Sequence, residues 1–283
     1  MKIAHCQFEP WCGEFEHNLK RFEEGLTRAD AAGAAIVSFP ECFLTGYPDT
    51  AELAGRDAFA ADSDAMARVL DVTSRHEVLA IVGFNERRGD ALYNTAAVAH
   101  RGHLLGLYSK CAAYQSFHKQ GREFPVWEHQ GVTFGVLICA DGGYIEPARI
   151  LALKGAQVIF APHFNCIKDS ALLQHFNKVR ADHTARAIEN GVYFVRGNNV
   201  ILDPAKSGIT RNPGVGYGDS YVMDPGGEIL VRSRRHAEDF IVAEIDTAVV
   251  NAARGSRNKS AWSWTEFSPF LAEAVRARTK GRG

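Results

Sequence analysis

The chain has 283 residues, of which 46% are hydrophobic and 23% are charged, and its formal net charge is −1. This composition is typical of a globular protein that is long enough to bury a sizeable core. A net charge near zero, with no long run of one sign, argues against binding to nucleic acid or to an anionic membrane through bulk electrostatics. We therefore expect neither a nucleic-acid partner nor a membrane partner.

The six cysteines do not have the spacing of a disulfide framework or a metal site. They contain no CxxC pair, they show no regular spacing with histidine, and several lie in apolar, strand-like runs. Reduced thiols in a cytoplasmic protein explain this pattern best. The first residues enter a strand pattern without the apolar segment of a signal peptide, and no apolar run reaches transmembrane length. We expect a cytoplasmic protein without a bound metal.

Hydrophobic periodicity in the first part of the chain predicts alternating strands and helices. Apolar runs predict buried strands at residues 3–8, 35–39 and 78–84. Apolar residues at helical spacing predict helices at about 15–32 and around 66–73. Residues 92–100 and 103–108 flank Arg101-Gly102, which is typical of a β-hairpin.

The second part of the chain repeats this alternation. A hairpin is expected at 126–129 and 132–138, followed by a helix at 145–154, a strand at 158–161, a helix at about 170–190, and strands at 192–195, 220–223, 229–232 and 240–245. In the longer helix, Arg186 and Glu189 have the i,i+3 spacing of an ion pair. Two similar halves predict a single α/β domain over residues 1–283, with two sheets and outer helices. The tail at 252–283 is expected to pack on the body or on a partner subunit.

Three side chains that could act in catalysis follow predicted strands. Glu41 comes after the strand at 35–39, Lys110 after the first hairpin, and Cys139 after the second hairpin. Taken singly, each has an ordinary interpretation as a surface carboxylate, a solvated lysine or a buried thiol. Ligand sites in α/β sheets form at the carboxyl ends of strands. Together the three supply a base, a fixed cation and a nucleophile.

The segments around these residues resemble the three motifs of the carbon–nitrogen hydrolase (nitrilase) superfamily. Residues 39–41 with 45–47 resemble the first motif, residues 108–110 the second, and residues 135–141 the third. The resemblance runs from the first strand to Asp246. The tracts that also match are Glu146, Arg149, Gly155-Ala156, Pro162, Arg186-Ala187, Glu189-Asn190 and residues 224–228.

The resemblance implies a four-layer α–β–β–α sandwich, commonly paired as a homodimer or assembled into a higher homo-oligomer, and cofactor-free hydrolysis of non-peptide C–N bonds. Cys139 would form a thioester, and Glu41 would accept the thiol proton and pass it to the leaving ammonia. Lys110 would favour the thiolate and then the oxyanion. The backbone N–H of Ala140 would be the second oxyanion donor.

One departure from the family pattern leaves the substrate subclass open. Many members carry a second Glu shortly after the lysine, and this chain has none between Lys110 and Glu123. Tyr114, Gln115 and His118 occupy the region instead, and we take His118 and Tyr114 as the candidate substitutes.

Other residues are candidates for the substrate pocket. These are Tyr47, Tyr144, His163, Phe164, Asn165 and Asn198. Cys42 and Cys111 neighbour Glu41 and Lys110, but the alternation of side chains along a strand points neighbours apart. Cys166 is a weaker nucleophile candidate. His118, His163 and His175 show no local pattern for a Cys–His pair.

We expect an amidase that acts on a small linear amide and releases ammonia and a carboxylic acid. An N-carbamoyl amino acid or amine amidohydrolase is the second hypothesis, and a nitrilase is the third. A carbamoyl substrate would need a cation for its carboxylate, for which Arg149 and Arg196 are candidates. A non-catalytic binding module on the same fold is the hypothesis from a different class.

Overall fold

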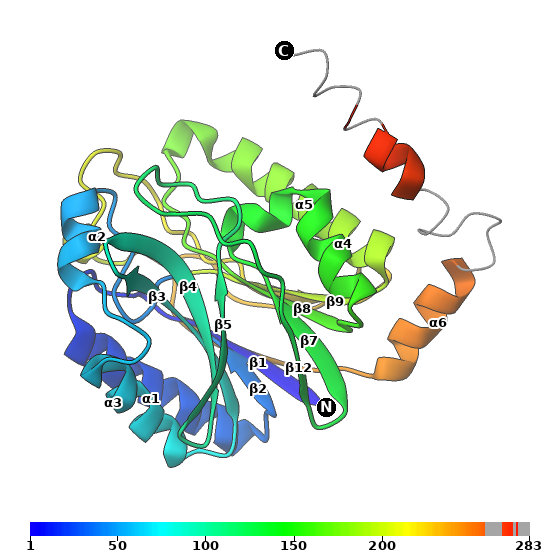
Figure 1. Cartoon of the computed structure of the whole chain (residues 1–283), viewed down its shortest axis with the longest axis horizontal. Helices are drawn as coiled ribbons and strands as arrows, with labels where there is room; N and C mark the ends of the chain where they lie inside the picture. The colour runs from blue at the N-terminus through cyan, green and yellow to red at the C-terminus, as the bar shows by residue number, and fades with distance from the viewer. Residues whose placement is uncertain (258–267, 274–275, 277–283) are drawn as a thin grey trace.

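The computed structural model describes residues 1–257, 268–273 and 276. Two six-stranded sheets lie face to face, and helices cover the outer face of each (Figure 1). This arrangement confirms the predicted four-layer α–β–β–α sandwich. No helix in the described ranges combines the length and the apolarity that crossing a membrane requires.

The first sheet has the strand order β12-β1-β2-β3-β4-β5. Pairing is parallel from β1 to β3 and antiparallel elsewhere. Two helices, α1 (Phe15–Ala32) and α3 (Asp64–Ser74), cover its outer face (Figure 1). Its strands are β1 (Lys2–Gln7), β2 (Ile36–Ser38), β3 (Leu79–Arg88), β4 (Ala91–His100), β5 (His103–Ser109) and β12 (Asp239–Glu244).

The second sheet has the strand order β11-β10-β9-β8-β7-β6. Pairing is parallel from β7 to β9 and antiparallel elsewhere. Its outer helices are α4 (Ile145–Leu153) and α5 (Leu172–Asn190). Its strands are β6 (Val126–His129), β7 (Val132–Val136), β8 (Val158–Pro162), β9 (Tyr193–Gly197), β10 (Tyr221–Met223) and β11 (Ile229–Arg232).

The main core fills the space between the two sheets and continues under the outer helices of the second sheet, where Leu151 of α4 belongs to the same cluster. Ile36 and Ile81 from the first sheet and Phe134 and Phe160 from the second are fully buried members of it. A second cluster, which includes Phe22 of α1, packs the outer face of the first sheet. This double burial explains why the central parallel strands read as continuous apolar runs rather than as alternating ones.

Most predicted elements form close to their predicted bounds. Helix α1 begins and ends as the apolar periodicity predicts, with Gly33 in the left-handed conformation after its last residue. The Arg186–Glu189 ion pair also forms. The sequence interpretation missed the short helix α2 (Ala51–Asp57), which is capped by Thr50, and the 3-10 helix Cys139–Gly143.

The end of the chain is described only in part. The predicted start of the tail at Ala252 falls inside α6 (Thr247–Arg257), whose Val250 is buried in the main apolar cluster. Of the tail aromatics, Trp262, Trp264 and Phe267 lie outside the described residues, and Phe270 lies within them.

Candidate active site

Three strand ends bring Glu41, Lys110 and Cys139 together. Glu41 and Lys110 follow β2 and β5 of the first sheet, and Cys139 follows β7 of the second. Glu41 and Lys110 are each 1% exposed, and the lysine Nζ lies 2.6 Å from Glu41 Oε1. The two sheets therefore contribute different parts of one site.

Further donors fix the carboxylate of Glu41. Asn94 Nδ2 donates to Oε1 at 2.7 Å, and the backbone N–H of Phe164 donates to Oε2 at 2.7 Å. A buried carboxylate is tolerated when its oxygens are hydrogen-bonded in this way. The sequence interpretation did not assign a role to Asn94, although a polar amide inside the β4 strand was a signal of a buried contact.

The loop that carries Glu41 lies directly on β3. A Cβ atom at Gly83 would be 2.4 Å from the backbone N of Cys42 and 3.1 Å from the Pro40 carbonyl oxygen. Cys42 itself has φ 52°, in the left-handed region. Glycine at position 83 thus permits the close approach that places Glu41.

Cys139 is the first residue of the 3-10 helix that follows β7, and its backbone is strained. Its φ is 49°, which is uncommon for a residue other than glycine and typical of functional turns. Ala140 follows it in the first turn of the helix, where backbone N–H groups have no partner within the helix. The turn therefore presents the Cys139 thiol and a backbone N–H group without a partner inside the helix at the same edge of the sheet.

A buried carboxylate ties the lysine segment to the cysteine segment. Asp141 accepts hydrogen bonds from the Tyr108 hydroxyl at 2.7 Å and from the backbone N–H groups of Ala112 at 2.7 Å and Ile138 at 2.9 Å. The side chain of Asp141 is fully buried. The sequence interpretation placed Asp141 in the third motif without assigning it this structural role.

The electrostatics of the site favour a neutral thiol at rest. Burial raises the pKa of Cys139 to about 12, the charge of Glu41 adds to the rise, and Lys110 opposes it. Burial acts to lower the pKa of Lys110, but Glu41 and Cys139 together hold it well above its usual value. At neutral pH a protonated thiol thus lies beside a charged lysine, and the thiol needs a base before it can attack.

Lys110 and Cys139 line a cavity of about 570 Å³, a size that suits a small ligand, and Glu41 contacts Lys110 outside that lining. The ring of Tyr47 stacks on that of Phe164 with centroids 4.9 Å apart. Of the predicted residues, the lining contains Tyr47, Lys110, Tyr114, Cys139, Ala140, Tyr144, His163, Phe164 and Asn165. It also contains residues of α5 that the sequence did not single out, among them Lys178, Asp182 and His183.

Two predicted residues lie elsewhere. His118 is buried outside the lining, with its Nε2 2.9 Å from Asn85 Oδ1. Asn198 is buried behind the cavity, where its Nδ2 donates to the Gly218 carbonyl oxygen at 2.6 Å. The proposed pocket role of Asn198 is therefore wrong. Neither His118 nor Tyr114 hydrogen-bonds Lys110 or Glu41 among the residues that the structure describes.

The alternative cysteines are engaged in other contacts. The thiol of Cys42 faces Asn85 Oδ1 at 3.7 Å, and that of Cys111 faces Asp141 Oδ1 at 3.2 Å. Cys166 lines the cavity, and its thiol faces the Asn212 carbonyl oxygen at 3.8 Å. Cys139 is thus the cavity thiol that has Glu41 and Lys110 beside it.

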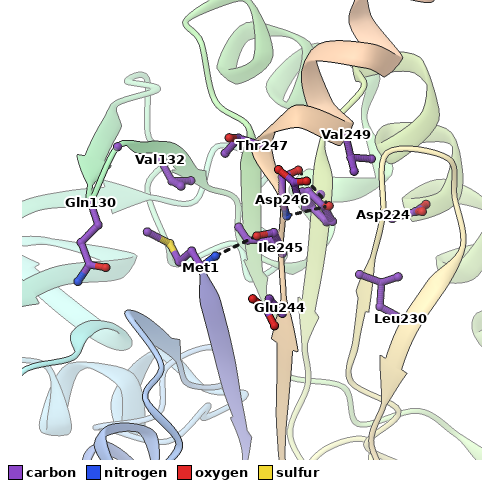
Figure 2. A pocket seen from close by; sticks show the side chains of 12 residues that line it. Met1, Gln130, Val132, Asp224, Leu230, Glu244, Ile245, Asp246, Thr247 and Val249 are labelled. Atoms are coloured by element: carbon purple, nitrogen blue, oxygen red, sulfur yellow. Dashed lines mark hydrogen bonds between the residues drawn. The ribbon is translucent and has the colours of Figure 1, made fainter.

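A second cavity, of about 630 Å³, lies where the chain begins (Figure 2). The Met1 ammonium donates to the Ile245 carbonyl oxygen at 3.0 Å beside it, and Asp246 and Val249 line it. The described residues of its lining include no cysteine, lysine or histidine. The smaller cavity is the one that carries groups suited to nucleophilic chemistry.

Comparisons with known proteins show the family of the chain. The sequence model of the carbon-nitrogen hydrolase family matches residues 2–255. A nitrilase of Pyrococcus abyssi is 30% identical over 263 residues, covering 90% of this chain and 93% of that protein. A citrullinase of Francisella tularensis is 26% identical over 275 residues, covering 90% and 92%. An amidase of Nesterenkonia AN1 from the nitrilase superfamily superposes with a TM-score of 0.74 at 23% identity, covering 91% and 96%. The chain belongs to the carbon–nitrogen hydrolase family.

Proposed function

We propose that the protein hydrolyses a small linear amide to a carboxylic acid and ammonia through a thioester on Cys139. The observation that carries this proposal is the meeting of Glu41, Lys110 and Cys139, of which Lys110 and Cys139 line a cavity of small-ligand size. The similarity to an amidase supports it, as does a structure of that amidase with an acetamide group added covalently to its active-site cysteine.

In the first half-reaction, Glu41 accepts the thiol proton as the sulfur of Cys139 attacks the amide carbon. A C–S bond forms, and the carbonyl π electrons move to oxygen. The ammonium of Lys110 and the backbone N–H of Ala140 stabilise the resulting oxyanion. When the intermediate collapses, the C–N bond breaks, Glu41 returns its proton to the departing nitrogen, and ammonia leaves an acyl thioester.

In the second half-reaction, a water molecule replaces the ammonia. Glu41 accepts a proton from this water as its oxygen attacks the thioester carbon. The C–S bond then breaks, the acid leaves, and the proton on Glu41 passes to the Cys139 sulfur. The site returns to the neutral thiol that its electrostatics favour.

The charges around the cavity favour a neutral substrate. Lys178 and Asp182 are paired at 2.7 Å, and the carboxylate of Asp49 accepts hydrogen bonds from the Thr210 hydroxyl and the Arg211 backbone. Burial lowers the pKa of His175 to about 4, so this histidine is neutral at pH 7. The charged groups of the lining, including Lys110 beside Glu41, are thus engaged with other protein groups. The rest of the lining offers apolar and neutral polar contacts, which suit an uncharged amide.

The N-carbamoyl hypothesis remains the second candidate because a citrullinase is among the relatives. Its predicted carboxylate partners, Arg149 and Arg196, are not part of the cavity lining. This arrangement favours an amide without a carboxylate over an N-carbamoyl amino acid. The nitrilase hypothesis ranks third, supported by the name of the Pyrococcus relative.

The test is ammonia release from a panel of short amides, N-carbamoyl compounds and nitriles, with mass spectrometry of the acid-quenched protein. We expect an acyl group on Cys139 whose mass identifies the amide. Cys139→Ala should abolish release, whereas Cys166→Ser, which removes the other thiol of the lining, should retain most of it. Full activity in Cys139→Ala would refute the mechanism. No release from any compound, with Cys139 no more reactive to iodoacetamide than Cys6, would favour a binding module.

The proposal includes a homodimer, as the family resemblance implies, and a cytoplasmic location. Light scattering of the purified protein tests the first. A mass twice that of the 31.1 kDa chain is expected.

A further inference from the structure

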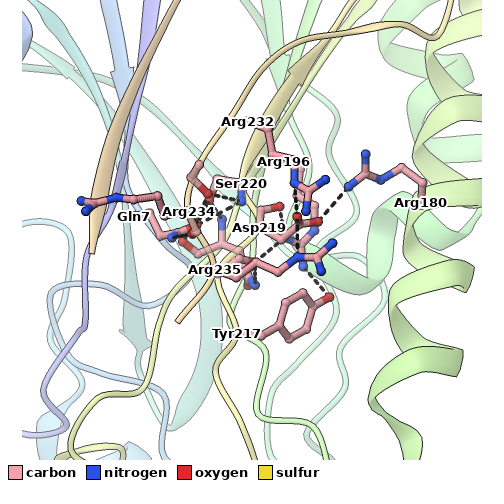
Figure 3. Close-up of polar contacts among 12 residues, drawn as sticks. Gln7, Arg180, Arg196, Tyr217, Asp219, Ser220, Arg232, Arg234 and Arg235 are labelled. Atoms are coloured by element: carbon pink, nitrogen blue, oxygen red, sulfur yellow. Dashed lines mark hydrogen bonds and ion pairs between the residues drawn. The ribbon is translucent and has the colours of Figure 1, made fainter. Parts of the chain in front are cut away.

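A buried arginine lies behind the wall of the cavity. Arg196 of β9 is 0% exposed. Its guanidinium donates to the carbonyl oxygens of Gly218 at 2.9 Å and Asp219 at 2.7 Å, and to the Tyr217 hydroxyl at 3.0 Å (Figure 3). Its remaining contact is with Asn165 Oδ1 at 2.6 Å, and Asn165 lines the cavity.

This guanidinium has no carboxylate partner among the described residues. The carboxylate of Asp219 is instead bound by Arg180 at 2.8 Å, Arg232 at 2.6 Å and Arg235 at 3.2 Å (Figure 3). Besides neutral oxygens, the guanidinium carbon lies 5.4 Å from the Tyr217 ring centroid and 5.9 Å from that of Tyr221. A buried cation without a carboxylate partner is unfavourable compared with an apolar side chain of similar size. Arg196 therefore calls for an explanation other than the stability of the fold.

The contact with Arg196 determines which way the Asn165 amide faces. A guanidinium has donors and no acceptor, so only the oxygen of the amide can point toward Arg196. The amide nitrogen must then point the other way, where Nδ2 lies 3.9 Å from the Sγ of Cys139. The backbone N–H of Asn165 donates to Asn199 Oδ1 at 2.7 Å and holds the main chain in place.

We propose that Arg196 is a positioning residue that holds Asn165 so that its amide N–H stabilises the negative charge forming on the Cys139 sulfur. This inference rests on the proposed thioester mechanism. A hydrogen-bond donor stabilises a thiolate more than a thiol, so the contact gains strength as Glu41 removes the proton. A long contact in the resting state is expected to shorten as the charge develops. Asn165 thus adds a side-chain donor to a sulfur that Lys110 and the backbone at Phe164 also stabilise.

The test is the rate of iodoacetamide alkylation of Cys139 between pH 7 and 9.5, followed by peptide mass spectrometry. The charged and titratable groups that interact with Cys139 are Glu41, Lys110, Cys42, Tyr47 and Tyr217, and all remain unchanged in the variants. Asn165→Leu removes the donor without adding a charge. We expect its alkylation rate to fall about tenfold at each pH, equivalent to a rise of about one unit in the thiol pKa, with kcat reduced more than KM is changed.

Two further variants test the part played by Arg196. Asn165→Asp keeps an oxygen facing the guanidinium, whereas Asn165→Leu does not, so the Asp variant should unfold at a higher temperature than the Leu variant. Equal unfolding temperatures would refute the positioning contact without requiring an Arg196 variant to fold. Arg180→Gln removes a nearby guanidinium bound to Asp219 and should leave the alkylation rate within about twofold, as expected for a local contact. A tenfold fall in Arg180→Gln would show that net charge, rather than the Asn165 contact, acts on the thiol.

Alkylation requires no substrate, so the two proposals fail separately. An unchanged alkylation rate in Asn165→Leu, in a protein that hydrolyses amides, would overturn the role of Asn165 and leave the proposed function in place. A tenfold lower alkylation rate in Asn165→Leu, in a protein that hydrolyses no amide, would support the role of Asn165 and overturn the proposed function.

Discussion

The hydroxyl of Tyr108 donates a 2.7 Å hydrogen bond to the carboxylate of Asp141, and this bond joins the two sheets beside the candidate active site. Tyr108 belongs to β5, two residues before Lys110, and Asp141 comes two residues after Cys139. The relative position of the lysine and the thiol therefore depends on a contact between residues 33 positions apart in the chain.

Tyr108→Phe should show how much this hydrogen bond contributes to the stability of the fold and to the placement of Lys110. It removes the hydroxyl, while the backbone donors of Ala112 and Ile138 remain on the Asp141 carboxylate. Loss of one buried hydrogen bond to a charged group should lower the free energy of unfolding by about 1–3 kcal/mol. A fall in kcat for amide hydrolysis should accompany it, because Lys110 is less firmly held. Urea unfolding and steady-state kinetics measure both effects, and wild-type values of both would contradict the coupling.

Glu41→Gln should abolish hydrolysis and make the thiol easier to ionise. Glu41 raises the pKa of Cys139 and Lys110 lowers it, so removal of the negative charge leaves the lowering effect unopposed. We expect a loss of at least about 10³-fold in kcat, as for removal of a general base that also serves as the acid. Iodoacetamide alkylation at pH 8 should become faster than in the wild type. Slower alkylation would show that the sign of the Glu41 effect is wrong.

Gly83→Ala should disturb the Glu41 loop. The new Cβ would lie 2.4 Å from the Cys42 backbone N, which cannot move without shifting Glu41. The free energy of unfolding should fall by about 1–3 kcal/mol, as expected for an overpacked site. The unfolding temperature and kcat should fall with it.

Gly55→Ala in α2 is the matched control, because the nearest atoms to its Cβ would be 3.9 Å away. Alanine favours helix over glycine by up to about 1 kcal/mol, so this variant should be at least as stable as the wild type. Comparable destabilisation of the two variants would argue against the steric explanation for Gly83.

Acidification should destabilise the fold through its buried histidines. Burial lowers the pKa of His5 to about 3 and that of His118 to about 4. Below the ordinary histidine pKa of 6.5, the unfolded chain binds protons that the folded chain does not, so the free energy of unfolding falls as pH drops from about 6.5 toward 4.

His118→Gln should make that decline shallower. Glutamine can still donate to Asn85 but does not titrate, so the variant lacks one of the protons that the unfolded state gains. Urea unfolding at several pH values between 4.5 and 7.5 measures the slope. A slope equal to that of the wild type would show that His118 is protonated in the fold as readily as in the unfolded chain.

The spacing of apolar residues was sufficient to predict helices and strands in which that spacing is regular. The apolar spacing of Leu19, Phe22 and Leu26 predicted α1, because these side chains lie on one face of a helix. The 3-10 helix at Cys139–Gly143 was missed, since five residues with two glycines have no such period. Helix α2 was missed for a similar reason, as it has only two turns and one buried residue, Ala54.

The amino-acid sequence was enough to predict two sheets with outer helices and three polar groups at strand ends, Glu41, Lys110 and Cys139, because each pattern involves residues close together in the chain. The resemblance of the three short motifs around these groups implied the family and its four-layer sandwich. Only the tertiary structure decided how these groups are held. Asn94, Asp141 and the Arg196–Asn165 pair come from segments that are distant in sequence. A hydrogen bond between such segments depends on how the two sheets pack against each other, and no local pattern of apolar and polar residues encodes it.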